Sequence, residues 1–181
     1  MLRTLVVQVE DKPGVLNRVA SLFRRRGFNI ESLTVGHTER PGVSRMTIAV
    51  DTDEAGAARL EANLYKLVNV LRVDNVSCLP AVYRDLAIIK VATTTETRAE
   101  IMQLVHVFRA RVVDVNHESM MIETTGTEDK INGLVEVLRG YGILEMARTG
   151  RVSMTRGSRT ESGAAGGNQD LIEDEPVSYS V

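Results

Sequence analysis

The chain has 181 residues, 43% of them hydrophobic, and a formal net charge of -2 at pH 7. This length is enough for one sizeable core or two small ones, and the near-neutral charge argues against nucleic acid or an anionic membrane as the main partner. The single cysteine, Cys78, excludes an internal disulfide and a cysteine-based zinc site. With no signal-peptide pattern and no apolar run of about 20 residues, we expect a soluble cytoplasmic protein.

The apolar residues of positions 1–80 predict the order strand, helix, strand, strand, helix, strand. Alternation is typical of half-buried strands, whereas spacing of three to four residues is typical of helices. The predicted strands cover residues 4–9, 28–38, 44–50 and about 70–79, and the predicted helices cover Val15 to about Arg26 and the run with Leu60, Leu64, Leu67 and Val68.

Both helices of this half carry capping signals. Arg24, Arg25 and Arg26 would lie in the last turn of the first helix, where positive charge is favourable, and Gly27 follows as a natural C-cap. We therefore interpret the basic cluster as a helix end and not as a nucleic-acid patch. Residues 51–54 supply the N-cap and first-turn acids of the second helix.

The same order starts again after Pro80. The predicted strands cover residues 86–91, 112–115, 120–124 and about 143–152, and the predicted helices cover residues 101–108 and 131–138. The repeat favours an α+β fold of two consecutive ferredoxin-like domains, residues 1–80 and 81–156, over one mixed sheet. In each domain the sheet face away from the helices, or an edge strand, needs cover. Residues 157–181 are rich in Gly, Ser and Ala and then acidic, which predicts a flexible tail.

The residue types that carry catalysis do not form a recognisable pattern. His37, His106 and His117 show no i,i+4 metal-site spacing, and the chain has no Gly-rich phosphate loop and no nucleophile elbow. We therefore expect no catalytic residues, metal or cofactor in this chain. RNA-recognition domains share the βαββαβ order but stack bases on strand aromatics, and residues 4–9 and 44–50 contain no aromatic residue.

One turn in the first half has the chemistry to bind a small molecule. The stretch Val9–Leu16 reads V-E-D-K-P-G-V-L, so a strand ends near Asp11, Pro13 and Gly14 break the pattern, and a helix begins at Val15. The first N–H groups of that helix have no intrahelical acceptor and can hold a carboxylate, while Asp11 can accept from an ammonium group. Together these groups suit a free amino acid, although a strand-to-helix turn needs Pro or Gly for structural reasons alone.

Several stretches of the sequence resemble a known family. Val9–Leu16 looks like the opening motif of an ACT domain, a βαββαβ module that binds amino acids and regulates metabolic enzymes. More specifically, the blocks R-G-F-N-I-E-S-L-T-V from Arg26, S-R-M-T-I from Ser44 and L-V-N-V-L-R-V from Leu67 resemble those of the small subunit of acetohydroxyacid synthase, also called acetolactate synthase. The resemblance is close in the first unit and looser in the second.

The resemblance implies a regulatory subunit without thiamine chemistry of its own. Such a subunit activates a catalytic large subunit and confers feedback inhibition by valine, and often by leucine or isoleucine, in branched-chain amino-acid biosynthesis. The large subunit would hold thiamine diphosphate, Mg²⁺ and FAD. The alternative that pattern alone leaves open is a stand-alone ACT-type amino-acid sensor that acts on another partner.

The resemblance also implies which residues hold the effector. In the family, the effector lies between two paired ACT domains, which predicts a homodimer. The N–H groups of Gly14, Val15 and Leu16 would bind its carboxylate and Asp11 its ammonium. The strand start at Asn29 and Ile30 would complete the site, with Asn29 of the other chain adding hydrogen bonds.

Overall fold

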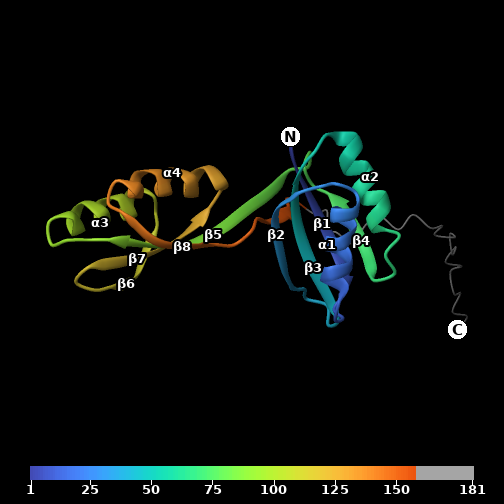
Figure 1. Ribbon diagram of the computed structural model, residues 1–181, viewed down its shortest axis with the longest axis horizontal. Helices are drawn as coiled ribbons and strands as arrows, with labels where there is room; N and C mark the ends of the chain where they lie inside the picture. Colours follow the sequence, from blue (N-terminus) through green and yellow to red (C-terminus); the bar gives the residue numbers. More distant parts are fainter. Residues whose placement is uncertain (158–181) are drawn as a thin grey trace, which may run out of the picture.

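The computed structural model describes residues 1–157 of the chain. Two antiparallel sheets, each with two helices on one face, form two units that lie side by side along the long axis of the molecule (Figure 1). Each unit has the order βαββαβ, which confirms the predicted α+β class with two consecutive ferredoxin-like units. The predicted tail lies outside the described residues except for Gly157. Within residues 1–157, no helix is long and apolar enough to cross a membrane.

The first unit follows the predicted elements within a few residues. Its sheet has the strand order β2-β3-β1-β4, so β1 and β3 are central and β2 and β4 form the edges. The elements are β1 (Leu2–Glu10), α1 (Val15–Arg25), β2 (Ile30–His37), β3 (Val43–Asp51), α2 (Glu54–Leu64) and β4 (Val70–Asn75).

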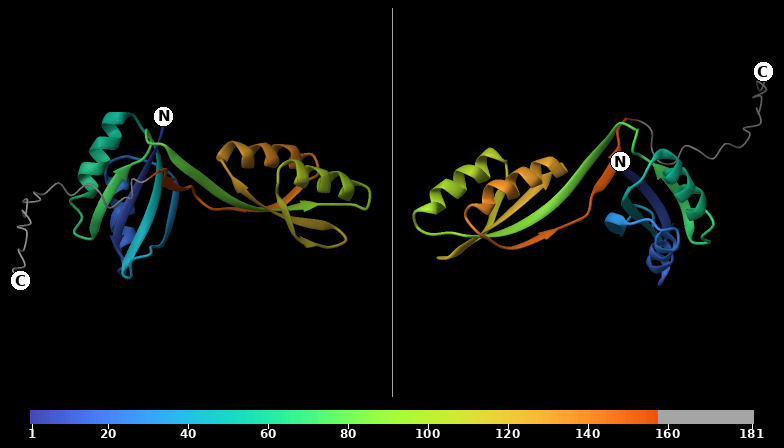
Figure 2. Two further views of the ribbon diagram at one scale, coloured as in Figure 1. Left: turned by 180° about the vertical axis from the view of Figure 1, so that it is seen from behind. Right: turned by 45° about the horizontal axis from the view of Figure 1, so that its top comes forward.

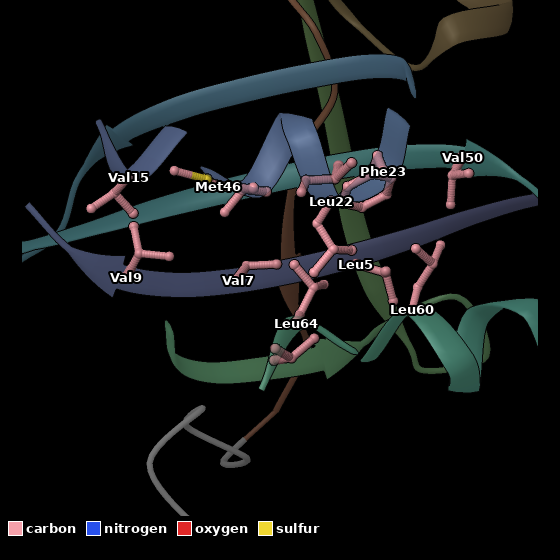
Figure 3. Packing of buried hydrophobic residues seen from close by; sticks show 13 residues of the cluster. Leu5, Val7, Val9, Val15, Leu22, Phe23, Met46, Val50, Leu60 and Leu64 are labelled. Atoms are coloured by element: carbon pink, nitrogen blue, oxygen red, sulfur yellow. The ribbon is translucent and has the colours of Figure 1, made fainter. Parts of the chain in front are cut away.

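The core of the first unit lies between this sheet and its two helices (Figure 3). Along β1, Leu5, Val7 and Val9 point toward the helices because alternate residues of a strand face opposite sides of the sheet. Burial of these side chains fixes the register of the sheet. The buried cluster consists of Leu5, Val7, Val9, Val15, Val19, Leu22, Phe23, Met46, Ile48, Val50, Leu60, Leu64 and Val73.

The ends of α1 and α2 confirm the predicted caps. Gly27 adopts a left-handed backbone with φ of +73°, and the N–H groups of Gly27 and Phe28 donate to the carbonyls of Arg24 and Phe23 at 3.2 and 3.0 Å. This pattern is a Schellman C-cap, so Gly27 ends α1. At the start of α2, Asp53 Oδ1 accepts from the Gly56 N–H at 2.7 Å.

The second unit repeats the arrangement with one difference. Its sheet has the order β6-β7-β5-β8, and the predicted strand from Ile143 to about Val152 is in fact two strands separated by residues 149–151. The elements are β5 (Ala81–Ala92), α3 (Thr97–Val107), β6 (Arg111–Val115), β7 (Ser119–Gly126), α4 (Glu128–Arg139), β8 (Ile143–Arg148) and β9 (Val152–Thr155).

The long strand β5 extends from the second unit toward the first (Figure 1). Its 12 residues span about 40 Å, and they pair with β9 near the first unit and with β7 and β8 in the second (Figures 1 and 2). The segment around β9 contacts the face of the first sheet that the helices leave open: a nitrogen of Arg45 in β3 donates to the Ser153 carbonyl at 2.6 Å. On this face Val6 and Ala49 are buried. The chain therefore supplies part of the cover that the open face needs.

Candidate functional site

The turn between β1 and α1 is held in place by backbone hydrogen bonds. The Asp11 N–H donates to the Gly42 carbonyl at 2.8 Å, which ties the turn to the hairpin between β2 and β3. Gly14 has φ of +82° and is the N-cap of α1. A side chain at this φ is strained, although an added Cβ would meet no atom within 4 Å. Gly14 is therefore needed for the backbone conformation and leaves the space beside it open.

The turn presents free N–H groups, as predicted from the sequence, but not the same three. The Val15 N–H donates to the Lys12 carbonyl at 3.3 Å, whereas the N–H groups of Gly14, Leu16 and Asn17 have no acceptor within the described residues. No side chain caps this end of α1, and its first turn carries no acid. The positive end of the helix dipole is therefore open to an anion. Asn17 was missed by the sequence analysis, although its position in the first turn of a helix is the signal for an unsatisfied N–H.

Asp11 lies at the same turn and is available to a cation. Its Oδ2 is 3.4 Å from Nδ1 of His37 at the end of β2, and both side chains are exposed. Lys12 does not neutralise Asp11, because its Nζ pairs with Glu10 at 3.0 Å. Hydrogen bonds from Asn69 first, and then from Lys12, hold the pKa of Glu10 below its usual range. The turn thus combines anion-binding N–H groups with an exposed carboxylate. His37 was not predicted as part of it.

The other predicted residues, Asn29 and Ile30, lie at the opposite end of the sheet. Ile30 pairs with Val50 of β3, and Val50 pairs with Arg3 near the start of β1, whereas the turn follows the end of β1 beyond Val9. Arg3 and Val9 are six residues apart along β1, or about 20 Å, a span far longer than a free amino acid. Asn29 Nδ2 donates to Glu31 Oε1 at 2.7 Å, and Asn29 is exposed. One chain alone therefore does not bring the two halves of the predicted site together.

The edge strand β2 connects these two ends. Its inner edge pairs with β3, and its outer edge has no partner strand within residues 1–157. Val35 in β2 is 43% exposed although it pairs with Met46, which faces the helices, and Leu16 in the first turn of α1 is 44% exposed. This edge therefore carries aliphatic side chains at the same end of the sheet as the open turn.

The βαββαβ fold and the open turn between β1 and α1 are those of an ACT domain, and comparison with known proteins confirms this class. An ACT domain described as "AHAS small subunit-like" matches residues 5–72. The family described as "Small subunit of acetolactate synthase" matches residues 84–157. The two matches together cover most of the chain.

Relatives of the whole chain point to the same family. The sequence is 50% identical over 159 residues to a probable acetolactate synthase small subunit of Archaeoglobus fulgidus, covering 88% of this chain and 99% of the relative. It is 51% identical over 156 residues to the acetolactate synthase small subunit of Mycolicibacterium smegmatis, covering 86% and 92%. The crystal structure of the acetolactate synthase small subunit from Thermotoga maritima superimposes with a TM-score of 0.82 at 42% identity, covering 86% of this chain and 98% of that one. The chain belongs to the acetolactate synthase small-subunit family.

Proposed function

We propose that this chain is the regulatory subunit of acetolactate synthase. It activates a catalytic large subunit, which holds thiamine diphosphate, Mg²⁺ and FAD. It also makes that subunit sensitive to inhibition by valine, and by leucine and isoleucine. Membership of the small-subunit family supports the partner, and the open turn at Gly14 supports an amino-acid effector. The proposal includes no catalytic group of this chain, because regulation needs only a binding site and a contact with the enzyme.

The observation that carries the effector proposal is the separation of the two half-sites along β2. If two copies pair their free β2 edges antiparallel, the Ile30 end of one strand lies beside the His37 end of the other. Asn29 and Ile30 of one chain then approach Asp11 and Gly14 of its partner. A two-fold axis generates two such sites, since an isologous interface repeats every contact. The same pairing covers an edge strand that would otherwise be open to aggregation.

The chemistry of this composite site fits a branched-chain amino acid. The carboxylate would accept from the N–H groups of Gly14, Leu16 and Asn17, with Val15 in the same turn, and the ammonium would donate to Asp11. The aliphatic side chain would lie on the apolar side chains of Leu16, Val35 and the partner's Ile30. Aliphatic effectors that differ by one methylene are separated by only about 1–3 kcal/mol in such a pocket. Recognition of leucine and isoleucine beside valine is therefore expected.

A site shared by two chains provides a route to regulation. A ligand that binds there stabilises the arrangement of the two chains that forms the site. It can change enzyme activity only by its different affinity for the active and inactive arrangements, typically about 1–3 kcal/mol. Binding at the small-subunit dimer and inhibition of the large subunit are thus linked without direct contact between effector and active site.

Two substitutions test the assignment of the effector site. Gly14→Asp places a carboxylate where the effector carboxylate would bind, and Asn29→Ala removes the amide from the other half-site. We expect either variant to activate the large subunit as the parent does and to lose inhibition by millimolar valine. A matched control is Gly142→Asp, which adds the same side chain at a left-handed glycine (φ +92°) in the second unit. Variants at Gly14 and Asn29 that remained as valine-sensitive as the control would rule out this site.

A further inference from the structure

Residues 148–151, the last residue of β8 and the link to β9, cross from the second unit to the first, and we call this segment the strap. Its first half is bound to the second unit. The Arg148 guanidinium donates to Asp85 Oδ2 at 2.6 and 3.1 Å and to Asn132 Oδ1 of α4 at 2.9 Å. The Thr149 N–H donates to the Leu86 carbonyl at 2.9 Å. This half of the strap therefore moves with β5 and α4.

The second half of the strap is bound to β2. We call the outer edge of β2, which the proposed effector site uses, the effector edge. The Arg151 N–H donates to Ser32 Oγ at 2.8 Å, and Thr34 Oγ1 donates to the Arg151 carbonyl at 3.0 Å. Gly150 lies so close to β2 that an added Cβ would be 2.6 Å from Ser32 Oγ. Ser32 and Thr34 lie between the two ends of β2 that the proposed site uses. A shift of β2 along or away from its sheet therefore acts directly on the strap.

The side chain of Arg151 joins the two units at one point. One guanidinium nitrogen donates to Thr4 Oγ1 in β1 at 3.4 Å, and another donates to Glu128 Oε2 in the first turn of α4 at 2.7 Å. The guanidinium carbon also lies 5.1 Å from the centre of the Tyr83 ring in β5. The Arg151 side chain is 18% exposed. A planar fork with several donors can hold these partners together, whereas the single ammonium of lysine cannot.

A cavity of about 460 Å³ lies beside this junction, lined among others by Leu2, Leu33, Asp85, Glu128 and Arg151. Its walls come from both units, so its size depends on how the units are placed relative to each other. Close-packed contacts resist small displacements, but a cavity gives the two units room to change their relative position. The junction thus combines a specific link with space for movement.

We propose that Arg151 couples the effector edge on β2 to the second unit. When an effector draws two β2 edges together, the strand moves against the strap, and the Arg151–Glu128 pair transmits the displacement to α4. Arg151 is a positioning residue that touches neither the effector nor the large subunit's active site. This inference rests on the proposed regulatory function, because it names the path by which that regulation reaches the second unit.

The test separates binding from inhibition in the complex with the large subunit. Arg151→Gln removes the charge, Arg151→Lys keeps it without the fork, and Glu128→Gln removes the acceptor charge on α4. We expect all three variants to bind valine by calorimetry within about twofold of the parent. For Arg151→Gln, maximal inhibition should fall: the ratio of the rates without and with saturating valine should drop toward one, because a coupling of typically about 5- to 150-fold is lost while the effector still binds. Arg139→Gln, which removes an exposed arginine paired with Glu136 on the same helix, is the matched control and should behave as the parent.

A double substitution makes the test specific to the pair. If Arg151 acts through Glu128, the double variant Arg151→Gln/Glu128→Gln should lose no more inhibition than Arg151→Gln alone. Retained valine binding shows that the variants are folded. Parent-like inhibition of Arg151→Gln, or inhibition lost together with valine binding, would overturn the coupling role while leaving the proposed function intact. A parent complex that no branched-chain amino acid inhibits would instead overturn the proposed function, and the coupling role with it.

Discussion

Replacing Gly150 by alanine tests how firmly the strap holds the two units. The new Cβ would lie 2.6 Å from Ser32 Oγ, 2.7 Å from Thr34 Oγ1 and 3.0 Å from the Leu33 carbonyl oxygen. A carbon and an oxygen in favourable contact are about 3.3–3.6 Å apart. Neither hydroxyl can simply rotate away, because both are engaged by the backbone of Arg151. The methyl group therefore fits only if the strap moves away from β2.

The magnitude follows from the contacts that this movement breaks. Two hydrogen bonds are lost, each with a net contribution of about 0.5–1.5 kcal/mol. The reduced freedom of the unfolded chain returns about 0.4–1 kcal/mol, as for glycine-to-alanine changes in general. We therefore expect Gly150→Ala to lower the free energy of unfolding by about 1–2 kcal/mol.

Urea denaturation of the whole chain measures this difference, and amide hydrogen exchange locates it. The Arg151 N–H should be protected in the parent and exchange faster in the variant. Gly133→Ala is a suitable control. Gly133 lies in the middle of α4, where alanine is favoured over glycine by about 1 kcal/mol, and its Cβ would be in ordinary contact, at 3.4 Å, with the Phe108 ring at the end of α3. Parent-like stability and Arg151 protection in Gly150→Ala would refute the inferred attachment of the strap to β2.

Three further predictions concern the core, a helix cap and pH. Leu60→Ala, at a fully buried position of the first core, should lower the free energy of unfolding by about 2–5 kcal/mol in denaturant titrations. Asp53→Ala should cost about 0.5–2 kcal/mol in the same assay, because the Gly56 N–H loses its acceptor. Burial raises the pKa of Tyr83. Its contribution to stability is therefore complete below the ordinary tyrosine pKa of about 10 and is lost as the pH rises through the raised value. The pKa of Tyr141 is also raised, so an ultraviolet titration should show a late-ionising component that is smaller, by one tyrosine, in Tyr83→Phe. An unchanged titration curve in that variant would contradict the assignment.

Local sequence signals predicted most of the fold. Apolar periodicity located the helices and strands of both units, and the caps at Gly27 and Asp53 follow from residue types a few positions apart. These signals act over short stretches of chain, so they are visible in the sequence. The division of the last predicted strand at residues 149–151 could not be predicted from such signals, because the strap is held by partners such as Ser32, which is 119 residues away from Arg151.

The candidate site was predicted in part for the same reason. The open helix N-terminus at Gly14 is a local feature, and the structure has it. The engagement of Val15 by Lys12, and the place of His37 beside Asp11, depend on how the turn folds against the hairpin. The 20 Å or so between the turn and Asn29 depends on strand register across β1, β3 and β2, which periodicity alone does not define. That distance supports the site between two chains that the family resemblance implies.

The most direct test of the proposed function is the initial rate of acetolactate formation by the cognate large subunit. The rate is measured for the large subunit alone and with this chain, each with and without millimolar valine. We predict that the chain raises the rate and that valine lowers it only when the chain is present. A chain that binds valine but changes neither the rate nor its response to valine would contradict the regulatory function and point to a sensor for another partner.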